Sequence, residues 1–125
     1  MRFSTLTALL AAVLALSGCA PSGPVDGAVA FKKCASCHQV GVNAHGNFGP
    51  ELNGLFGRRA GSTADFAYSE AMKRSGIVWN DATLAAFLRD PDKVVPGTRM
   101  RFWGIGDDRE LAALIAHLRT YQDVK

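Results

Sequence analysis

Two cysteines and a histidine carry the most specific chemistry in this sequence: Cys34, Cys37 and His38, in the run Cys-Ala-Ser-Cys-His. Two thiols three positions apart, followed at once by an imidazole, can bind a haem through two thioether bonds while the histidine coordinates its iron. A Cys-x-x-Cys pair alone also fits a zinc site or a redox dithiol. The sequence has neither a second cysteine pair nor a strand-helix-strand pattern around the motif, so it predicts haem attachment.

A methionine far along the chain provides a second ligand for such an iron. Met100 ends a loop rich in proline and glycine, residues 96–100. Thioether sulfur is a soft, neutral ligand that favours ferrous iron, and paired His and Met ligands raise the reduction potential. His45 follows His38 too closely to reach the opposite face of the same haem, so we interpret it as a loop residue. Met72 lies in a helix-like segment, where we expect it to fill the core.

These separated motifs resemble class I cytochromes c, of the bacterial cytochrome c2 and mitochondrial type, over about residues 27–121. The resemblance implies an all-α fold in which the first and last helices cross and loops wrap one covalently bound haem c. It also implies an iron held by His38 and Met100. With both axial positions filled, one-electron transfer is expected rather than enzyme catalysis.

The run of residues 49–58, Gly-Pro-Glu-Leu-Asn-Gly-Leu-Phe-Gly-Arg, is also characteristic of the family. The resemblance implies that the Pro50 carbonyl accepts a hydrogen bond from Nδ1–H of His38, which orients the ring and raises its basicity. It further implies that Arg58 lies near a haem propionate, whose charge would otherwise be uncompensated in a buried site.

Three more residues are predicted to contact the cofactor. Tyr68 and Trp79 stand where the family places propionate donors, and each combines an apolar ring with one hydrogen-bond donor. Thr98 belongs to the methionine loop. Two departures from common family patterns reduce the polarity expected near the ligand: Phe87 replaces a frequent Tyr, and Met72 replaces a frequent Asn.

Helix signals place these motifs. Asp26 is a plausible N-cap for a first helix, whose small residues Gly27 and Ala30 would allow a close crossing. The last helix is the clearest by pattern, because Asp107 and Glu110 have capping-box spacing and four apolar residues follow at helical intervals.

A third helix is expected between these two, and a loop precedes it. The helix should start at Asn80 or Asp81 and end at Pro91, with the loop to Met100 following directly. Residues 40–48 read as a loop.

The N-terminal residues read as an export signal. Arg2 precedes an apolar run, residues 6–16, that is too short to span a bilayer. The run ends in Leu-Ser-Gly-Cys, similar to the lipobox of bacterial lipoproteins, which makes Cys19 a predicted site of lipid attachment. An ordinary signal peptide, with Cys19 removed or left as a free or disulfide-bonded thiol, is the alternative.

The predicted organisation is therefore a signal peptide over residues 1–18, a lipid-anchored tether over 19–26 and a cytochrome c domain over 27–125. Seven tether residues after the cysteine reach about 25 Å when fully extended, so the domain should stay close to the lipid surface. The expected location is a bacterial membrane, facing the periplasm.

The formal net charge of +3 gives no reason to expect a nucleic-acid partner. We expect a monomer without a small-molecule substrate, which carries electrons between a cytochrome bc complex and a terminal oxidase or reaction centre. Acidic surfaces of these complexes would meet a ring of positive side chains: Lys32, Lys33, Lys93, Arg99 and Arg101. A permanent redox subunit of one dehydrogenase or oxidase, and a haem peroxidase or gas sensor, are the alternatives.

Overall fold

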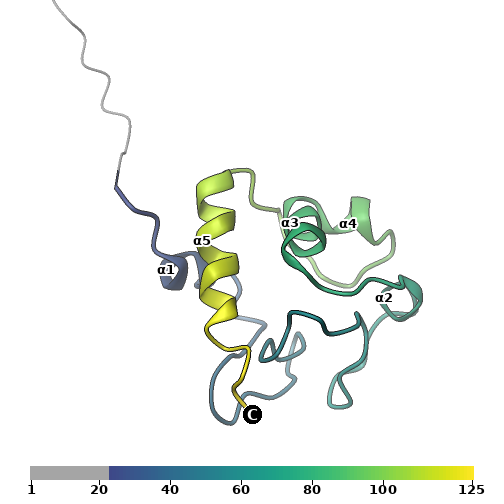
Figure 1. Cartoon of the computed structure of the whole chain (residues 1–125). Helices are drawn as coiled ribbons and strands as arrows, with labels where there is room; N and C mark the ends of the chain where they lie inside the picture. Colours follow the sequence, from purple (N-terminus) through teal and green to yellow (C-terminus); the bar gives the residue numbers. More distant parts are fainter. Residues whose placement is uncertain (1–22) are drawn as a thin grey trace, which may run out of the picture.

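The computed structural model describes residues 23–125, so the predicted signal peptide, Cys19 and the first part of the predicted tether lie outside the described residues. The described part has five helices: α1 (Gly27–Phe31), α2 (Glu70–Arg74), α3 (Asp81–Arg89), α4 (Pro91–Val94) and α5 (Asp108–Arg119). Within residues 23–125 the backbone forms no strand beyond one isolated antiparallel bridge between Arg59 and Val78. The all-α prediction is confirmed (Figure 1).

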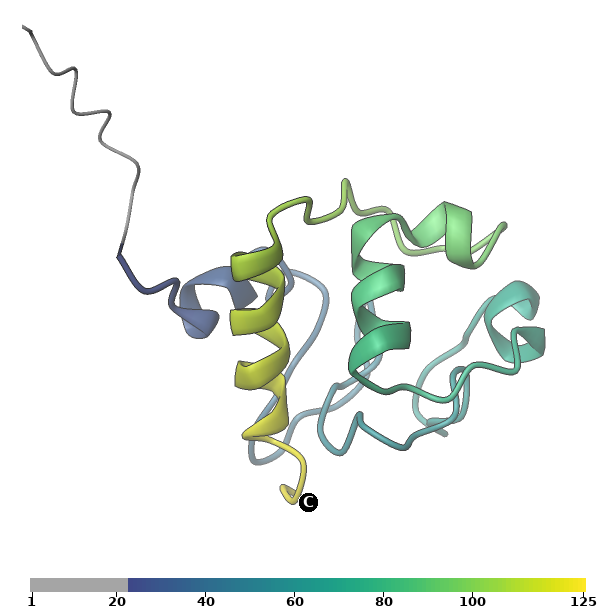
Figure 2. The ribbon, with the colours of Figure 1, turned by 45° about the horizontal axis from the view of Figure 1, so that its top comes forward.

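Helices α1 and α5 cross at close range, as predicted, and Figures 1 and 2 both show them side by side. Gly27 makes this possible, because a methyl group placed on it would come within 2.2 Å of the Ala113 carbonyl oxygen in α5. Ala30 is buried one turn later. Asp26 is the N-cap, and its side chain accepts a hydrogen bond from the Ala28 N–H at 2.8 Å. Small residues thus determine where the two ends of the domain meet.

The start of α5 differs in one respect from its predicted capping box. The Asp107 side chain accepts a hydrogen bond from the Glu110 N–H at 2.7 Å, as expected of an N-cap. The Glu110 carboxylate instead lies 2.5 Å from Nζ of Lys33, next to the haem-attachment motif. The glutamate therefore joins the last helix to the segment after α1. The inner face of α5 is apolar and buried, through Leu111, Leu114 and Leu118.

Helix α3 begins at the expected place but is not followed directly by a loop. Asn80 is its N-cap, in a reciprocal capping box with Thr83. The expectation that Pro91 only ends this helix is wrong, because Pro91 also begins α4. Proline suits the first position of a helix, where its missing N–H would have no partner, and the Asp90 side chain caps the new helix.

The longest stretch without a helix lies between α1 and α2, and in Figure 1 it runs below α3 and α5. Figure 2 shows α3 beside α5, and the two helices are in contact. The buried apolar residues form one cluster to which the loops contribute as well as the helices, including Leu55, Ala60, Trp79 and Ile105. Helices and loops from every part of the domain therefore contribute to the core.

Among residues 23–125, no helix is both long enough and apolar enough to cross a membrane.

The close contact at Gly27 predicts a stability change. Replacing Gly27 with alanine should lower the free energy of unfolding by about 1–3 kcal/mol, because the methyl group would meet the rigid backbone of α5. Guanidinium denaturation of the complete protein measures this loss. The matched control is Gly106→Ala, where an added methyl group has no neighbour within 4 Å. Equal denaturation midpoints for the two variants would contradict the close crossing.

Candidate functional site

A cavity of about 300 Å³ lies at the centre of the domain. Nine site residues were predicted within the described part of the chain, and the cavity brings all of them together. They are Cys34, Cys37, His38, Pro50, Arg58, Tyr68, Trp79, Thr98 and Met100. Most of its other walls are apolar side chains from the loops and from α3 and α5, including Leu52, Leu55, Leu84, Phe87, Leu88 and Leu114.

The haem-attachment motif sits in a tight turn directly after α1. The N–H groups of Cys37 and His38 both donate to the Cys34 carbonyl oxygen, at 3.0 and 2.9 Å. These bonds place both thiols and the imidazole at one side of the cavity. Burial raises the pKa of the Cys34 thiol to about 11, whereas Cys37 is exposed.

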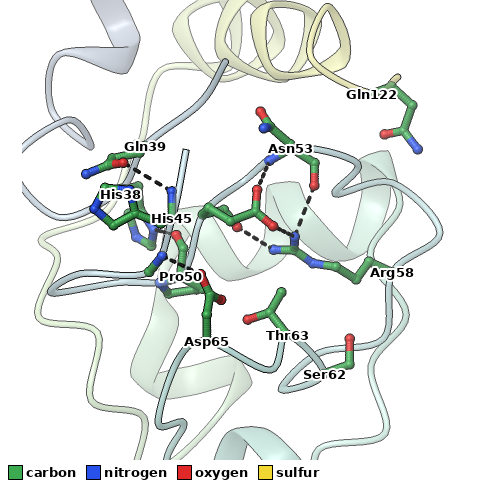
Figure 3. Close-up of polar contacts among 12 residues, drawn as sticks. His38, Gln39, His45, Pro50, Asn53, Arg58, Ser62, Thr63, Asp65 and Gln122 are labelled. Carbon is green, nitrogen blue, oxygen red and sulfur yellow. Dashed lines mark hydrogen bonds and ion pairs between the residues drawn. The ribbon is translucent and has the colours of Figure 1, made fainter. Parts of the chain in front are cut away.

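The imidazole of His38 is oriented by the hydrogen bond that the resemblance implied. Its Nδ1 lies 2.7 Å from the Pro50 carbonyl oxygen (Figure 3). A carbonyl can only accept, so Nδ1 carries the proton and the lone pair remains on Nε2. Burial also lowers the pKa of His38, which favours the neutral ring that a metal requires. The structure therefore presents one nitrogen in the state that binds iron.

A glycine allows this imidazole to lie where it does. A methyl group on Gly49 would come within 2.5 Å of Cε1 of His38, so the ring rests directly on the glycine. The Gly49 N–H donates to the Cys37 carbonyl oxygen at 2.9 Å, which fixes this loop against the attachment motif. The loop of residues 49–58 thus positions the imidazole through Gly49 and the Pro50 carbonyl.

Met100 reaches the cavity from the loop between α4 and α5. The buried Thr98 shapes that loop, because its side-chain oxygen accepts a hydrogen bond from the Met100 N–H at 3.3 Å. The Thr98 N–H donates to the Val95 carbonyl oxygen at 3.0 Å, and Gly97 provides the left-handed conformation that the turn needs. Thr98 was predicted to contact the cofactor, and here it holds the backbone of the methionine.

Arg58 is held in place by a residue that the sequence did not identify. Its guanidinium donates to the Glu51 carboxylate at 3.1 Å and to the Glu51 carbonyl oxygen at 2.8 Å (Figure 3). A third bond reaches the Asn53 carbonyl oxygen at 3.1 Å. This half-buried pair keeps the guanidinium at the cavity wall. A position for Arg58 beside a haem propionate remains a prediction.

The two predicted aromatic donors also lie at the cavity. The Tyr68 hydroxyl hydrogen-bonds to Oγ1 of Thr63 at 2.6 Å, a partner with no signal in the sequence. Trp79 is buried, and its ring lies 5.2 Å from that of Phe87, between centroids. The backbone N–H of Trp79 donates to the Arg58 carbonyl oxygen at 3.0 Å, which ties Trp79 to the same loop as the guanidinium.

The two rival ligands have different positions. His45 is exposed, with Nδ1 3.1 Å from the Asn43 carbonyl oxygen, and it does not line the cavity. Met72 is buried in α2, as expected of a core residue, but it also lines the cavity. His45 therefore lies away from the site. Met72, in contrast, is a second thioether at the cavity wall.

The predicted ring of positive side chains is only partly at the cavity. Lys33, Arg99 and Arg101 line it, whereas Lys32 and Lys93 are exposed elsewhere on the surface. Lys33 forms an ion pair with Glu110, so it attracts an acidic partner less strongly.

The residues around the cavity fit a covalently bound haem. Two thiols and a neutral imidazole stand at one wall, a thioether enters on a different loop, and apolar side chains provide surfaces for a flat ring. The combination of a buried imidazole oriented by a carbonyl with a second soft ligand is suited to holding iron in both oxidation states.

Comparisons with known proteins agree with this geometry. Residues 24–122 match the family model for cytochrome c. Cytochrome c2 of Rhodoplanes tepidamans is 50% identical over 95 residues, which cover 76% of this chain and 89% of that protein. Cytochrome c2 of Blastochloris viridis is 42% identical over 105 residues, covering 82% and 83%. The solved structure of cytochrome cH from Methylobacterium extorquens is 43% identical, covers 75% of this chain and 94% of its own, and superposes with a TM-score of 0.70.

The family match covers nearly all the described residues, and Cys34 and Cys37 fit the family's haem-attachment motif. One covalently bound haem c with histidine and methionine ligands follows from it, in an electron-transfer protein rather than an enzyme. With its crossed terminal helices and a cavity lined by the loops, α3 and α5, this chain belongs to the cytochrome c family.

Proposed function

We propose that this chain is a lipid-anchored carrier that moves single electrons in the periplasm, from a quinol-oxidising cytochrome bc complex to a terminal oxidase or reaction centre. The observation that supports a carrier is that His38 and Met100, from opposite parts of the chain, line one cavity with the attachment cysteines. An iron held by both residues would have no open position for a substrate.

Each residue at the cavity has a separate task in this proposal. Cys34 and Cys37 would hold the haem through two thioether bonds, and Nε2 of His38 would bind its iron. The Pro50 carbonyl keeps the imidazole in one tautomer and one orientation, so that little rearranges when the charge of the site changes. Met100 supplies the sulfur ligand. The haem, when bound, supplies the one-electron couple.

The anchor would be Cys19, joined to the domain by a short segment. Part of this segment is tied to the domain, because Nη2 of Arg109 donates to the Gly23 carbonyl oxygen at 2.5 Å. The contact brings Gly23, in the middle of the tether, to the first turn of α5. The length of chain free to extend from the lipid is therefore less than the 25 Å first expected, roughly 3.5 Å for each residue held.

Positive side chains near the cavity would guide acidic partners to the carrier. Arg99 and Arg101 are exposed and line the cavity, and Lys93 is exposed on α4. Attraction between exposed charges accelerates encounter and weakens as salt is added. A permanent subunit of one dehydrogenase or oxidase, the alternative left open by the sequence, would instead copurify with it at a fixed ratio.

The iron ligand can be tested by a matched pair of substitutions. Met100→Leu should open one axial position, so that the ferrous protein binds carbon monoxide readily and its reduction potential falls. Met72→Leu replaces the other thioether at the cavity with a residue of similar volume and should leave both properties unchanged. Difference spectra with and without carbon monoxide measure the effect. Carbon monoxide binding by the Met72→Leu protein alone would assign the ligand to Met72.

The anchor can be tested by replacing Cys19 with serine. We expect the unaltered protein in the membrane fraction, released only by detergent, because two or more acyl chains hold a protein stably. The Cys19→Ser protein should appear in the soluble periplasmic fraction with the same haem spectrum, and Ser22→Ala should behave as the unaltered protein. Release of the unaltered protein without detergent would rule out a lipid anchor.

A further inference from the structure

Trp103 is the most exposed large apolar residue in the described part of the chain. The residue has 103% of its reference accessible area, so the domain covers none of it. Tryptophan is costly to leave in water, because it is among the largest apolar side chains. Single exposed apolar residues are common on protein surfaces, so a role for this ring has to come from its neighbours and its place in the chain.

The neighbouring residues hold this side chain outward. Phe102, directly before it, packs against the core, and Ile105, two residues after it, is buried. The Ile105 N–H donates to a carbonyl of α3 at 2.9 Å. Gly104 has a φ of +90°, and a methyl group on it would come within 2.1 Å of another α3 carbonyl oxygen. The backbone is thus fixed on both sides of Trp103, in the loop that joins α4 to α5 (Figure 2).

The ring also follows immediately after the residues that carry the iron ligand. Arg99, Met100, Arg101 and Phe102 all line the cavity. Arg99 donates to a backbone carbonyl at 3.3 Å, and Arg101 lies 3.8 Å from the carboxylate of Asp92. Both side chains of that pair are more than 60% exposed, so the ion pair holds Arg101 weakly. An uncovered indole therefore follows, by two and four residues, two arginines that line the cavity.

We propose that Trp103 is a docking anchor for the redox partner protein, entering an apolar socket whose rim is acidic. This inference rests on the proposed carrier function and names the residue that would recognise the partner. Tryptophan and arginine are the residues most enriched among those that dominate binding energy at protein interfaces. A fixed backbone lowers the entropy lost on binding, because only the side-chain torsions of Trp103 then remain to be ordered.

A protein partner fits the position better than a lipid surface. Electron exchange requires the partner to approach the cavity wall closely, and a membrane covering Arg99 and Arg101 would block that approach. A single ring preceded by two exposed arginines also offers little apolar area for insertion into lipid, which requires a broader apolar face. Arginine beside tryptophan matches a carboxylate rim around an apolar pocket.

The test uses the purified mature protein and detergent-solubilised membranes from the bacterium that produces it. Reduction by added quinol and oxidation by the membrane oxidase are followed separately, for the unaltered protein, Trp103→Ala and Trp103→Phe. Val42→Ala is the matched control, because Val42 is 79% exposed and does not line the cavity. Ferricyanide oxidation reports electron transfer without protein docking, and binding to phosphatidylglycerol vesicles reports lipid contact.

We expect Trp103→Ala to lower kcat/KM about tenfold or more in at least one direction, mainly through KM. Trp103→Phe should recover part of the loss, Val42→Ala should stay within about twofold, and ferricyanide rates should be equal for all four proteins. Equal kcat/KM values for Trp103→Ala and the unaltered protein would overturn the anchor. Weaker vesicle binding by Trp103→Ala without a change in kcat/KM would assign the ring to lipid and overturn the proposal.

A failure of the carrier function itself would look different. In that case the unaltered protein would react with ferricyanide but exchange no electrons with the membranes in either direction. The partner proposed for Trp103 would then be excluded together with the function on which it rests.

Discussion

The central constraint on this domain is that its interior is a cavity lined by loops, which only a bound group can fill. The longest helix has 12 residues, and three of the five have five or fewer. Isolated helices of this length are marginal in water, so they depend on contacts with the rest of the domain. Leu55, Trp79, Leu88 and Leu114 are buried but face the cavity, so much of their packing depends on what occupies it.

The same constraint connects stability to chemistry. The hydrogen bond from His38 to the Pro50 carbonyl selects the tautomer that binds iron, and it also joins two loops across the cavity wall. Thr98 positions the second ligand in a similar way, because its side chain accepts a hydrogen bond from the Met100 N–H. Both ligand residues are thus held by hydrogen bonds to the loops that close around the cavity.

Several parts of this structure could be predicted because they depend on local patterns. The attachment motif, the methionine loop and the last helix each have residue types at fixed spacing. The prediction for Pro91 was wrong because a proline can follow the end of one helix and also begin the next. Here the Asp90 side chain caps a new helix that begins at Pro91.

Contacts between distant segments had no comparable signal. The pairing of Lys33 with Glu110 depends on the crossing of α1 and α5. The bond between Arg58 and Glu51 and that between Tyr68 and Thr63 depend on how the loops fold back, which short motifs do not encode. Residues with ordinary sequence patterns thus complete the site that the distinctive motifs mark.

The dependence of the fold on the bound haem can be measured directly in a chain that cannot attach it. A protein with both Cys34→Ser and Cys37→Ser, purified without haem, would be heated while its helical circular dichroism is recorded. We expect a gradual change without a cooperative transition, because the apolar walls of the cavity would have nothing to pack against. A sharp cooperative transition, with the helical signal of the complete protein, would show that the polypeptide folds without the haem.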